Sequence, residues 1–282
     1  MMRWIASLIG AWLLFLIQLP AAPPSFRFII LGDRTGEAQR DIYEQIWREI
    51  AATQPAFVIT TGDTIEGLDD STAESQWRQW EKIIRPYHGI PLYLTPGNHD
   101  IWSPRSEALF QQYASHPLHY SFDYEQAHFT VLDNSQSDAL SPAEFQFLEA
   151  DLSRHAAQPL KFVISHRPSW LIDAAVTNTS APFHQLMKKY GVQFVLAGHV
   201  HQMIYAKVEG ISYVSLPSAG GHLRVSGAYK DGWFFGYTMV QVNGKTAEFQ
   251  IRQSGSKAAT TLDDWGLLGL TQKSAGTPVT VP

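Results

Sequence analysis

The chain has 282 residues, of which 45% are hydrophobic and 17% charged, a composition typical of a globular protein that forms one α/β domain with a substantial core. A formal net charge of −5 without a basic run argues against a dedicated nucleic-acid surface, because affinity for a phosphate backbone depends on clustered positive charge. The absence of cysteine excludes disulfides, thiolate zinc sites and cysteine nucleophiles, so any metal must be bound by His, Asp, Glu, Asn or water.

Residues 1–24 are typical of an export signal. Arg3 gives a positively charged start, Ile5–Leu19 is an apolar run, and the small residues Ala21–Ala22 follow it. The run is short for a full bilayer span, and Pro23–Pro24 crowd the cleavage site, so a cleaved signal peptide and an uncleaved anchor both remain open. Either alternative predicts an exported protein, which is periplasmic, secreted or associated with the membrane through this segment.

From residue 26 onward, short apolar strands alternate with longer amphipathic helices. The first helix, for example, has isoleucines at positions 42, 46 and 50 on one face. Strands are predicted at Phe26–Leu31, Ala56–Thr60, Pro91–Thr95, His128–Asp133, Leu160–Ser165 and Val192–Ala197, and helices at Glu37–Ala52, Thr72–Arg85, Pro142–His155 and Ala181–Tyr190. This alternation predicts a largely parallel sheet with helices packed outside it.

After residue 210 the pattern changes, because strands follow one another around glycine-rich turns without clear helices. These strands are predicted at Ile211–Leu216, Phe234–Val242 and Thr246–Ile251, and Asn243-Gly244 indicates a hairpin between the last two. We therefore expect an antiparallel section that completes a single domain over residues 25–268. The polar segment 269–282, rich in Pro, Gly and Thr, is predicted to be a flexible tail.

A polar motif follows each of five predicted strands. The motifs are Gly32-Asp33, Gly62-Asp63, Gly97-Asn98-His99-Asp100, Ser165-His166-Arg167 and Gly198-His199-Val200-His201. In open α/β sheets, ligands bind beyond the carboxyl ends of the strands, and a glycine before a ligand lets the backbone turn and approach closely. His199 and His201 lie two residues apart, so on an extended segment both would face the same centre. Each motif alone is typical of a plain turn, but their combination predicts one shared site.

The series resembles the calcineurin-like metallophosphoesterase family, which includes purple acid phosphatases and cyclic-nucleotide phosphodiesterases, over roughly residues 26–201. The resemblance implies an α/β fold in which two mixed β-sheets pack as a sandwich flanked by helices, giving four layers. It also implies that one metal ion is bound by Asp33 and His201, a second by Asn98, His166 and His199, and both by a bridging Asp63.

The resemblance implies two divalent or trivalent ions, and such nitrogen-rich ligands suit Mn, Fe or Zn rather than calcium. Two ions about 3.5–4 Å apart bind both the attacking and the leaving oxygen and generate hydroxide near neutral pH. By the same resemblance, His99 would lie beside the leaving group, where it would donate a proton to the departing oxygen or stabilise charge on the phosphoryl oxygens. Arg34 and Arg167, next to ligands, are candidates for clamping phosphate oxygens, with structural ion pairs as the alternative.

The expected function is therefore metal-dependent hydrolysis of a phosphate monoester or diester by a metal-bridging hydroxide. The substrate classes left open are a phosphorylated small molecule, a nucleotide, a lipid head group and a phosphoprotein. The absence of a G-x-x-x-x-G-K-[ST] loop disfavours kinase or NTPase chemistry.

The first motif departs from the family pattern, because Thr35 stands where many members have a metal-binding histidine. Purple acid phosphatases also lack that histidine and use a tyrosine three residues after the bridging Asp, where this chain has Glu66. Thr35, Glu66, water or a loop residue such as His222 would then complete the first site. This departure keeps a second hypothesis open, in which a metal-weakened relative binds a phosphorylated ligand without turnover.

Overall fold

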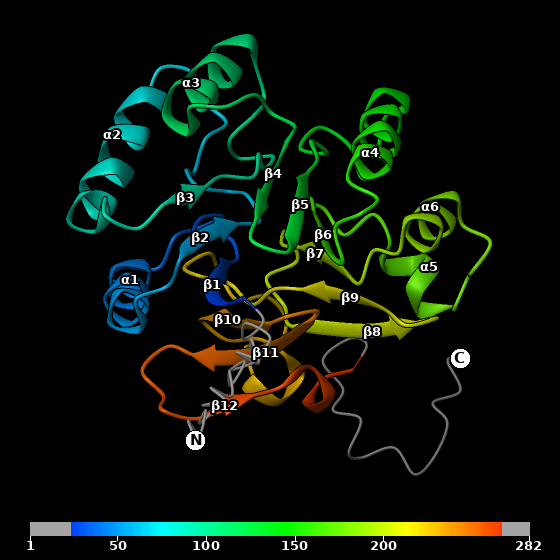
Figure 1. Cartoon of the computed structure of the whole chain (residues 1–282). Coiled ribbons are helices and arrows are strands. Elements are labelled where there is room, and N and C mark those ends of the chain that lie inside the picture. Colours follow the sequence, from blue (N-terminus) through cyan, green and yellow to red (C-terminus); the bar gives the residue numbers. More distant parts are fainter. Residues whose placement is uncertain (1–23, 267–282) are drawn as a thin grey trace, which may run out of the picture.

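The computed structural model describes residues 24–266 (Figure 1), so the predicted signal segment, apart from Pro24, and the predicted tail at 269–282 lie outside the described residues. The strands are β1 (Ser25–Leu31), β2 (Phe57–Thr60), β3 (Leu92–Tyr93), β4 (Tyr120–Tyr124), β5 (Ala127–Val131), β6 (Leu160–Ile164), β7 (Phe194–Ala197), β8 (Ile204–Val208), β9 (Ile211–Ser215), β10 (Gly236–Asn243), β11 (Thr246–Gln253) and β12 (Ala259–Thr260). The α-helices are α1 (Ile42–Thr53), α2 (Ala73–Ile84), α3 (Pro104–Ala114), α4 (Pro142–Arg154), α5 (Leu171–Ala175) and α6 (Pro182–Tyr190). Between residues 24 and 266, no helix is long and apolar enough to cross a membrane.

The strands form two six-stranded mixed sheets. In the first sheet, of order β12-β11-β10-β1-β2-β3, the strands β1, β2 and β3 are parallel and β10 runs antiparallel to β1. In the second sheet, of order β4-β5-β6-β7-β9-β8, four central strands are parallel and both edge strands are antiparallel. The parallel strands of each sheet therefore deliver their carboxyl ends to one edge.

The two sheets pack face to face through an aromatic core. Phe28 of β1 stacks on Phe57 of β2 with ring centroids 5.0 Å apart and meets Phe129 of β5 edge-on at 5.2 Å. Helices cover the outer faces, with α1 to α3 against the first sheet and α4 to α6 against the second. The four layers confirm the predicted fold class, a sandwich of two mixed sheets flanked by helices.

The predicted strands and helices up to residue 197 are all present, although β3 contains only two strand residues, 92–93, instead of Pro91–Thr95. The predicted hairpin at residues 243–244 is confirmed, since Asn243 pairs with Thr246 at the turn between β10 and β11. The antiparallel assignment of Ile211–Leu216 holds on only one side: β9 is antiparallel to β8 but parallel to β7, and it lies in the second sheet. All five residues of β9 are buried, which is expected of a parallel strand covered on both faces.

Helix α1 begins at Ile42, five residues later than the predicted start at Glu37. Glu37 and Asp41 have φ values of 65° and 64°, in the left-handed region that a right-handed helix cannot contain. The segment before α1 is instead a loop that binds the loop after β2: the Glu66 carboxylate accepts the backbone N–H groups of Glu37 at 3.1 Å and Ala38 at 2.7 Å.

Candidate metal centre

Loops from the carboxyl ends of strands in both sheets meet at the predicted site. Asp33 follows β1, and both of its carboxylate oxygens accept the backbone N–H of His199, after β7, at 2.9 Å. The ring of His166, after β6, donates from Nδ1 to the carbonyl oxygen of Thr61, after β2, at 2.8 Å. The site therefore joins the two sheets, with ligand candidates supplied from each side.

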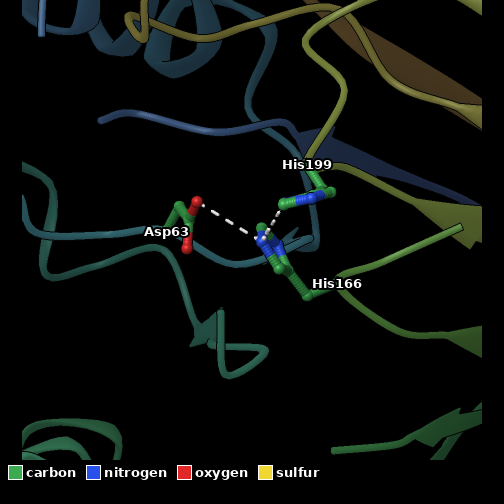
Figure 2. A group of neighbouring side chains, drawn as sticks. All are labelled: Asp63, His166 and His199. Atoms are coloured by element: carbon green, nitrogen blue, oxygen red, sulfur yellow. Dashed lines mark hydrogen bonds and ion pairs between the residues drawn. The ribbon is translucent and has the colours of Figure 1, made fainter. Parts of the chain in front are cut away.

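Three other side chains converge on the Nε2 atom of His166, and Figure 2 shows two of them, Asp63 and His199. This Nε2 lies 3.3 Å from Asp63 Oδ2, 2.9 Å from Asn98 Oδ1 and 3.2 Å from His199 Nδ1. Because His166 Nδ1 carries a proton bonded to Thr61, its Nε2 has the lone pair when the ring is neutral. Ligand atoms of Asp63, His166 and His199 all lie within 4.8 Å of one another. Lone pairs that converge in this way are the donor set of a cation site.

The pKa values at this cluster are set by burial and by the charges of its own members. Burial lowers the pKa of His166, but the nearby Asp63 carboxylate raises it more, to about 9. Burial raises the pKa of Asp63, but His166 and the N–H of His99 lower it more, to about 2. Burial, His166 and Arg167 together lower the pKa of His199 to about 4. Asp63 is thus ionised and His199 neutral near pH 7, the forms that bind metal, whereas His166 carries a second proton that a metal ion would have to displace.

Asp33 and His201 form a second pair beside this cluster. His201 Nε2 lies 3.2 Å from Asp33 Oδ2, and both side chains are at most 1% exposed. The other ring nitrogen of His201 donates to the carbonyl oxygen of His222 at 2.7 Å, which fixes the orientation of the ring as in many metal-binding histidines. The His222 side chain is 53% exposed, so His222 contributes its backbone here rather than its imidazole.

The segment from His199 to His201 is a turn and not the extended segment expected from the sequence. Both histidines have left-handed φ values, 68° and 59°. Consequently His199 faces His166 while His201 faces Asp33, so the two rings serve different centres rather than one.

His99 lies beside both groups of ligands. Its backbone N–H donates to Asp63 Oδ1 at 2.9 Å, and its Nδ1 donates to the carbonyl oxygen of Glu66 at 2.6 Å. The remaining nitrogen, Nε2, lies near Gly36. A Cβ atom added to Gly36 would lie 3.9 Å from His99 Nε2 and 3.6 Å from His201 Nε2. His99 therefore presents one free nitrogen to the region where the predicted leaving group would lie.

Thr35 and Glu66 both stabilise the loops around the first pair, and their side-chain hydrogen bonds are to backbone groups rather than to Asp33 or His201. The Thr35 hydroxyl lies 2.9 Å from the carbonyl oxygen of Asp63 and 2.6 Å from that of Ile65, so its single proton is engaged there. The Glu66 carboxylate accepts two backbone N–H groups, as described above. Among the residues from 24 to 266, the expected gap in the first site is therefore not filled by either side chain.

The two arginine candidates differ in their surroundings. Arg34 donates to the carbonyl oxygen of Thr64 at 2.8 Å and lies over the Tyr43 ring, 5.4 Å from its centroid, which favours the structural alternative. Arg167 donates to Asp138 at 2.7 Å, and the same nitrogen, Nη1, lies 3.4 Å from His199 Nε2. Arg167 is therefore the candidate that adjoins the metal ligands.

Two positioning residues were missed by the sequence analysis. Asn134, after β5, accepts the backbone N–H groups of His166 and Arg167, both at 3.0 Å. Asp100 accepts the N–H groups of Thr64 at 2.9 Å and Gly97 at 3.0 Å. Asn134 follows a predicted strand, so its position at a strand end was an available signal. Asp100 belongs to the recognised motif, but nothing in the sequence showed that it ties two loops together.

Comparison with known proteins identifies the family and the relatives of this chain. The profile of the family described as calcineurin-like phosphoesterase matches residues 26–203. Among curated proteins, the chain is 24% identical to human tartrate-resistant acid phosphatase type 5 over 270 residues, covering 79% of this chain and 81% of that protein. It is 26% identical to the 3',5'-cyclic adenosine monophosphate phosphodiesterase CpdA of Escherichia coli K12 over 200 residues, covering 67% of this chain and 69% of that protein.

Solved structures show the same fold at lower sequence identity. A purple acid phosphatase from yellow lupin seeds matches with a TM-score of 0.65 and 18% identity, covering 86% of this chain but only 54% of that one. GAP50, described as the anchor in the inner membrane complex of Plasmodium, matches with a TM-score of 0.60 and 15% identity, covering 84% of this chain and 88% of that one. Since the family profile spans most of the chain, this protein belongs to the calcineurin-like phosphoesterase family.

Proposed function

We propose that this protein hydrolyses a phosphate monoester or diester with the help of two metal ions. The family and its phosphatase and phosphodiesterase relatives support a metal-dependent phosphoester hydrolase in general. The observation that carries the proposal is the convergence of Asp63, Asn98 and His199 on His166 Nε2. This donor set fits Mn, Fe or Zn, because its imidazole and oxygen ligands match the preferences of those ions.

We assign one ion to Asn98, His166 and His199, the other to Asp33 and His201, and a shared position to Asp63. When bound, such ions supply Lewis acidity and lower the pKa of water, which provides a nucleophile near neutral pH. The neighbouring side chains then have separate tasks. His99 holds a proton at Nε2 for the leaving oxygen when its ring is doubly protonated, since Nδ1 is bonded to Glu66. Arg167 orients an anionic oxygen next to His199.

The proposed substrates are phosphorylated small molecules, because the relatives named above are an acid phosphatase and a cyclic-nucleotide phosphodiesterase. We propose that the protein is exported, on the basis of Arg3 and the apolar run at 5–19. Substrate selection would depend on segments near the site such as 67–75 and 102–119, the second of which contains α3.

The test is hydrolysis by the purified full chain, supplied with Mn²⁺ or Zn²⁺, of a panel of phosphate monoesters and diesters. We expect turnover of at least one class and loss of both turnover and bound metal in Asp63→Asn. Glu149→Gln, which changes an exposed carboxylate paired with Lys189 on the outer helix layer, is the control and retains activity. Turnover unaffected by Asp63→Asn would contradict the proposal.

The alternative, a relative that binds a phosphorylated ligand without turnover, is favoured by one observation. Thr35 replaces the expected histidine, and its hydroxyl is engaged with the backbone at Asp63 and Ile65. The alternative predicts that calorimetry detects binding of inorganic phosphate to the metal-loaded chain while no ester in the panel is hydrolysed.

A further inference from the structure

Asp138 lies beside the candidate metal centre although no motif marks it. It belongs to the loop between β5 and α4, and its Oδ1 accepts a hydrogen bond from Arg167 Nη1 at 2.7 Å. The Asp138 side chain is 85% exposed, whereas that of Arg167 is 20% exposed. Arg167 is also fixed from a second direction, because its Nε donates to the carbonyl oxygen of Ser135 at 3.3 Å. The arginine is thus the anchored partner, and the aspartate is the exposed one.

Arg167 lies between the exposed Asp138 carboxylate and the ligand candidate His199. His199 Nδ1 faces His166 Nε2 at 3.2 Å. Arg167 Nη1 is within hydrogen-bond distance of His199 Nε2, at 3.4 Å. Because a guanidinium has five N–H donors and no acceptor, Arg167 favours an anionic oxygen beside His199. In the described structure, the carboxylate next to Arg167 is that of Asp138.

We propose that Asp138 is a specificity-determining residue, whose carboxylate competes for the anion position at Arg167, next to His199, and disfavours dianionic phosphate monoesters relative to monoanionic phosphate diesters. The inference rests on the proposed function, because it concerns the substrate class of the same site.

Charge alone sets the expected size of the effect. In a solvent-exposed setting, two unit charges about 6 Å apart interact strongly enough to change an equilibrium constant about threefold. A dianion experiences twice the interaction of a monoanion, so removal of the Asp138 charge favours a monoester about tenfold and a diester about threefold. Because exposed charges are screened by salt, the difference between the two substrates shrinks at high ionic strength.

The test compares the wild-type holoenzyme with Asp138→Asn at about pH 8, where a phosphate monoester is a dianion since its second pKa is about 6. Asparagine keeps an acceptor oxygen for Arg167 and removes only the charge. The substrates are p-nitrophenyl phosphate and bis(p-nitrophenyl) phosphate. We expect kcat/KM to rise about tenfold for the first and about threefold for the second, mainly through KM, in low salt.

Two control variants and a second readout separate this role from a structural one. Asp138→Glu keeps the charge and retains the wild-type ratio between the substrates. Glu149→Gln removes an exposed charge on the outer surface of α4 and leaves the ratio unchanged. Calorimetry on the metal-loaded chain gives a readout without turnover: Asp138→Asn binds inorganic phosphate dianion more tightly, with a smaller gain for dimethyl phosphate.

The outcomes distinguish this inference from the proposed function. If kcat/KM changes equally for both substrates, or if activity toward both is lost, the charge of Asp138 does not discriminate between monoester and diester. If the wild type hydrolyses neither ester, the proposed function fails, and the calorimetric comparison then decides the inference alone. In that case the proposed role of Asp138 is wrong if the metal-loaded chain does not bind phosphate, or if Asp138→Asn does not strengthen the binding.

Discussion

His166 shows how a residue that we propose as a metal ligand is held in position. Its backbone N–H donates to Asn134 Oδ1 at 3.0 Å, and its ring Nδ1 donates to the Thr61 carbonyl oxygen at 2.8 Å. These two bonds fix the position of the ring, so that Nε2 faces Asp63. The entropy of ordering the ligand is therefore lost during folding rather than during metal binding.

His99→Ala separates catalysis from metal binding. His99 is bonded to Glu66 and Asp63 but is assigned no metal ion, so the variant is expected to keep the metal content of the wild type. We expect kcat to fall about 10²–10⁴-fold, the usual loss when a general acid is removed. Metal analysis and steady-state kinetics on the same preparation check this. A variant that loses metal in proportion to activity would show that His99 is a ligand.

The residue types of the site could be predicted from the sequence, because each predicted ligand follows an apolar strand within a short motif. The role of Thr35 could not be predicted from the sequence. Its hydroxyl donates toward the carbonyl oxygens of Asp63 and Ile65 because of the way two loops pack together. Asp138 was missed for the same reason. It approaches Arg167 only when the loop after β5 folds next to the loop after β6.

At the level of elements, the loop after β2 has no room for a side chain at Gly62. Its φ is +108°, and a Cβ atom there would lie 2.5 Å from His166 Nδ1. Gly62→Ala is therefore expected to displace the His166 ring and weaken binding of the ion assigned to it by at least tenfold, the scale seen when the support of a ligand is disturbed. Metal titration measures the change.

Gly210→Ala is the matched control for that variant. Gly210 also has a left-handed φ, +87°, but a Cβ atom there meets nothing within 4 Å. The Gly210→Ala variant therefore has similar backbone strain to Gly62→Ala but no contact between the added Cβ atom and His166. An equal loss of metal affinity in both variants would assign the effect to general destabilisation and contradict the steric explanation.

A buried network outside the metal centre joins the β4–β5 hairpin to α4. Asp151 accepts hydrogen bonds from His128 Nε2 at 2.9 Å, Thr130 at 2.7 Å and Ser121 at 2.7 Å. Burial raises the pKa of Asp151, but these bonds lower it more, from 3.8 to about 2. A carboxyl whose pKa is lower in the folded state stabilises the fold above its unfolded pKa.

The network predicts a specific pH dependence of stability. The contribution of Asp151, about 2 kcal/mol, is complete above about pH 4 and is lost as the pH falls through about 2. Asp151→Asn should therefore lower the free energy of unfolding near pH 6 but differ little from the wild type near pH 2. Chemical denaturation of both proteins across this range checks the prediction, and a constant difference at every pH would contradict it.

Strands and helices with clear periodicity could be predicted, whereas the partner of a strand could not. The pattern at 211–216 indicates a buried strand, yet a buried apolar run does not reveal whether β9 pairs with β7 or closes the first sheet. The start of α1 was misplaced because the Glu66 carboxylate binds the segment at 37–38, a tertiary contact that overrides local helix propensity.

For the whole molecule, the metal centre depends on how the two sheets pack. Asp33, Asp63 and Asn98 come from loops of the first sheet, while His166 and His199 come from loops of the second. Phe129 is fully buried between them and stacks on Phe162 with centroids 4.8 Å apart. A change in the packing of the sheets would therefore separate ligands from the two sides.

Phe129→Ala tests this dependence. The cavity should lower the free energy of unfolding by about 3–5 kcal/mol, and metal affinity should fall with it even though no ligand is changed. Phe145→Ala, on the partly exposed surface of α4, is the control, with a smaller loss of stability and unchanged metal binding. Unchanged metal affinity in a destabilised but folded Phe129 variant would contradict the proposed coupling.

The central claim, catalysis by two ions at one site, is tested most directly by adding metal stepwise to the chelated protein while measuring both bound metal and hydrolysis of a phosphate ester. The chelated chain should be inactive. Because the pair formed by Asp33 and His201 has fewer described ligands than the cluster around His166, the first equivalent should bind tightly without full activity, and activity should develop with the second. Full activity in metal-free protein, or at one equivalent of metal per chain, would contradict the account.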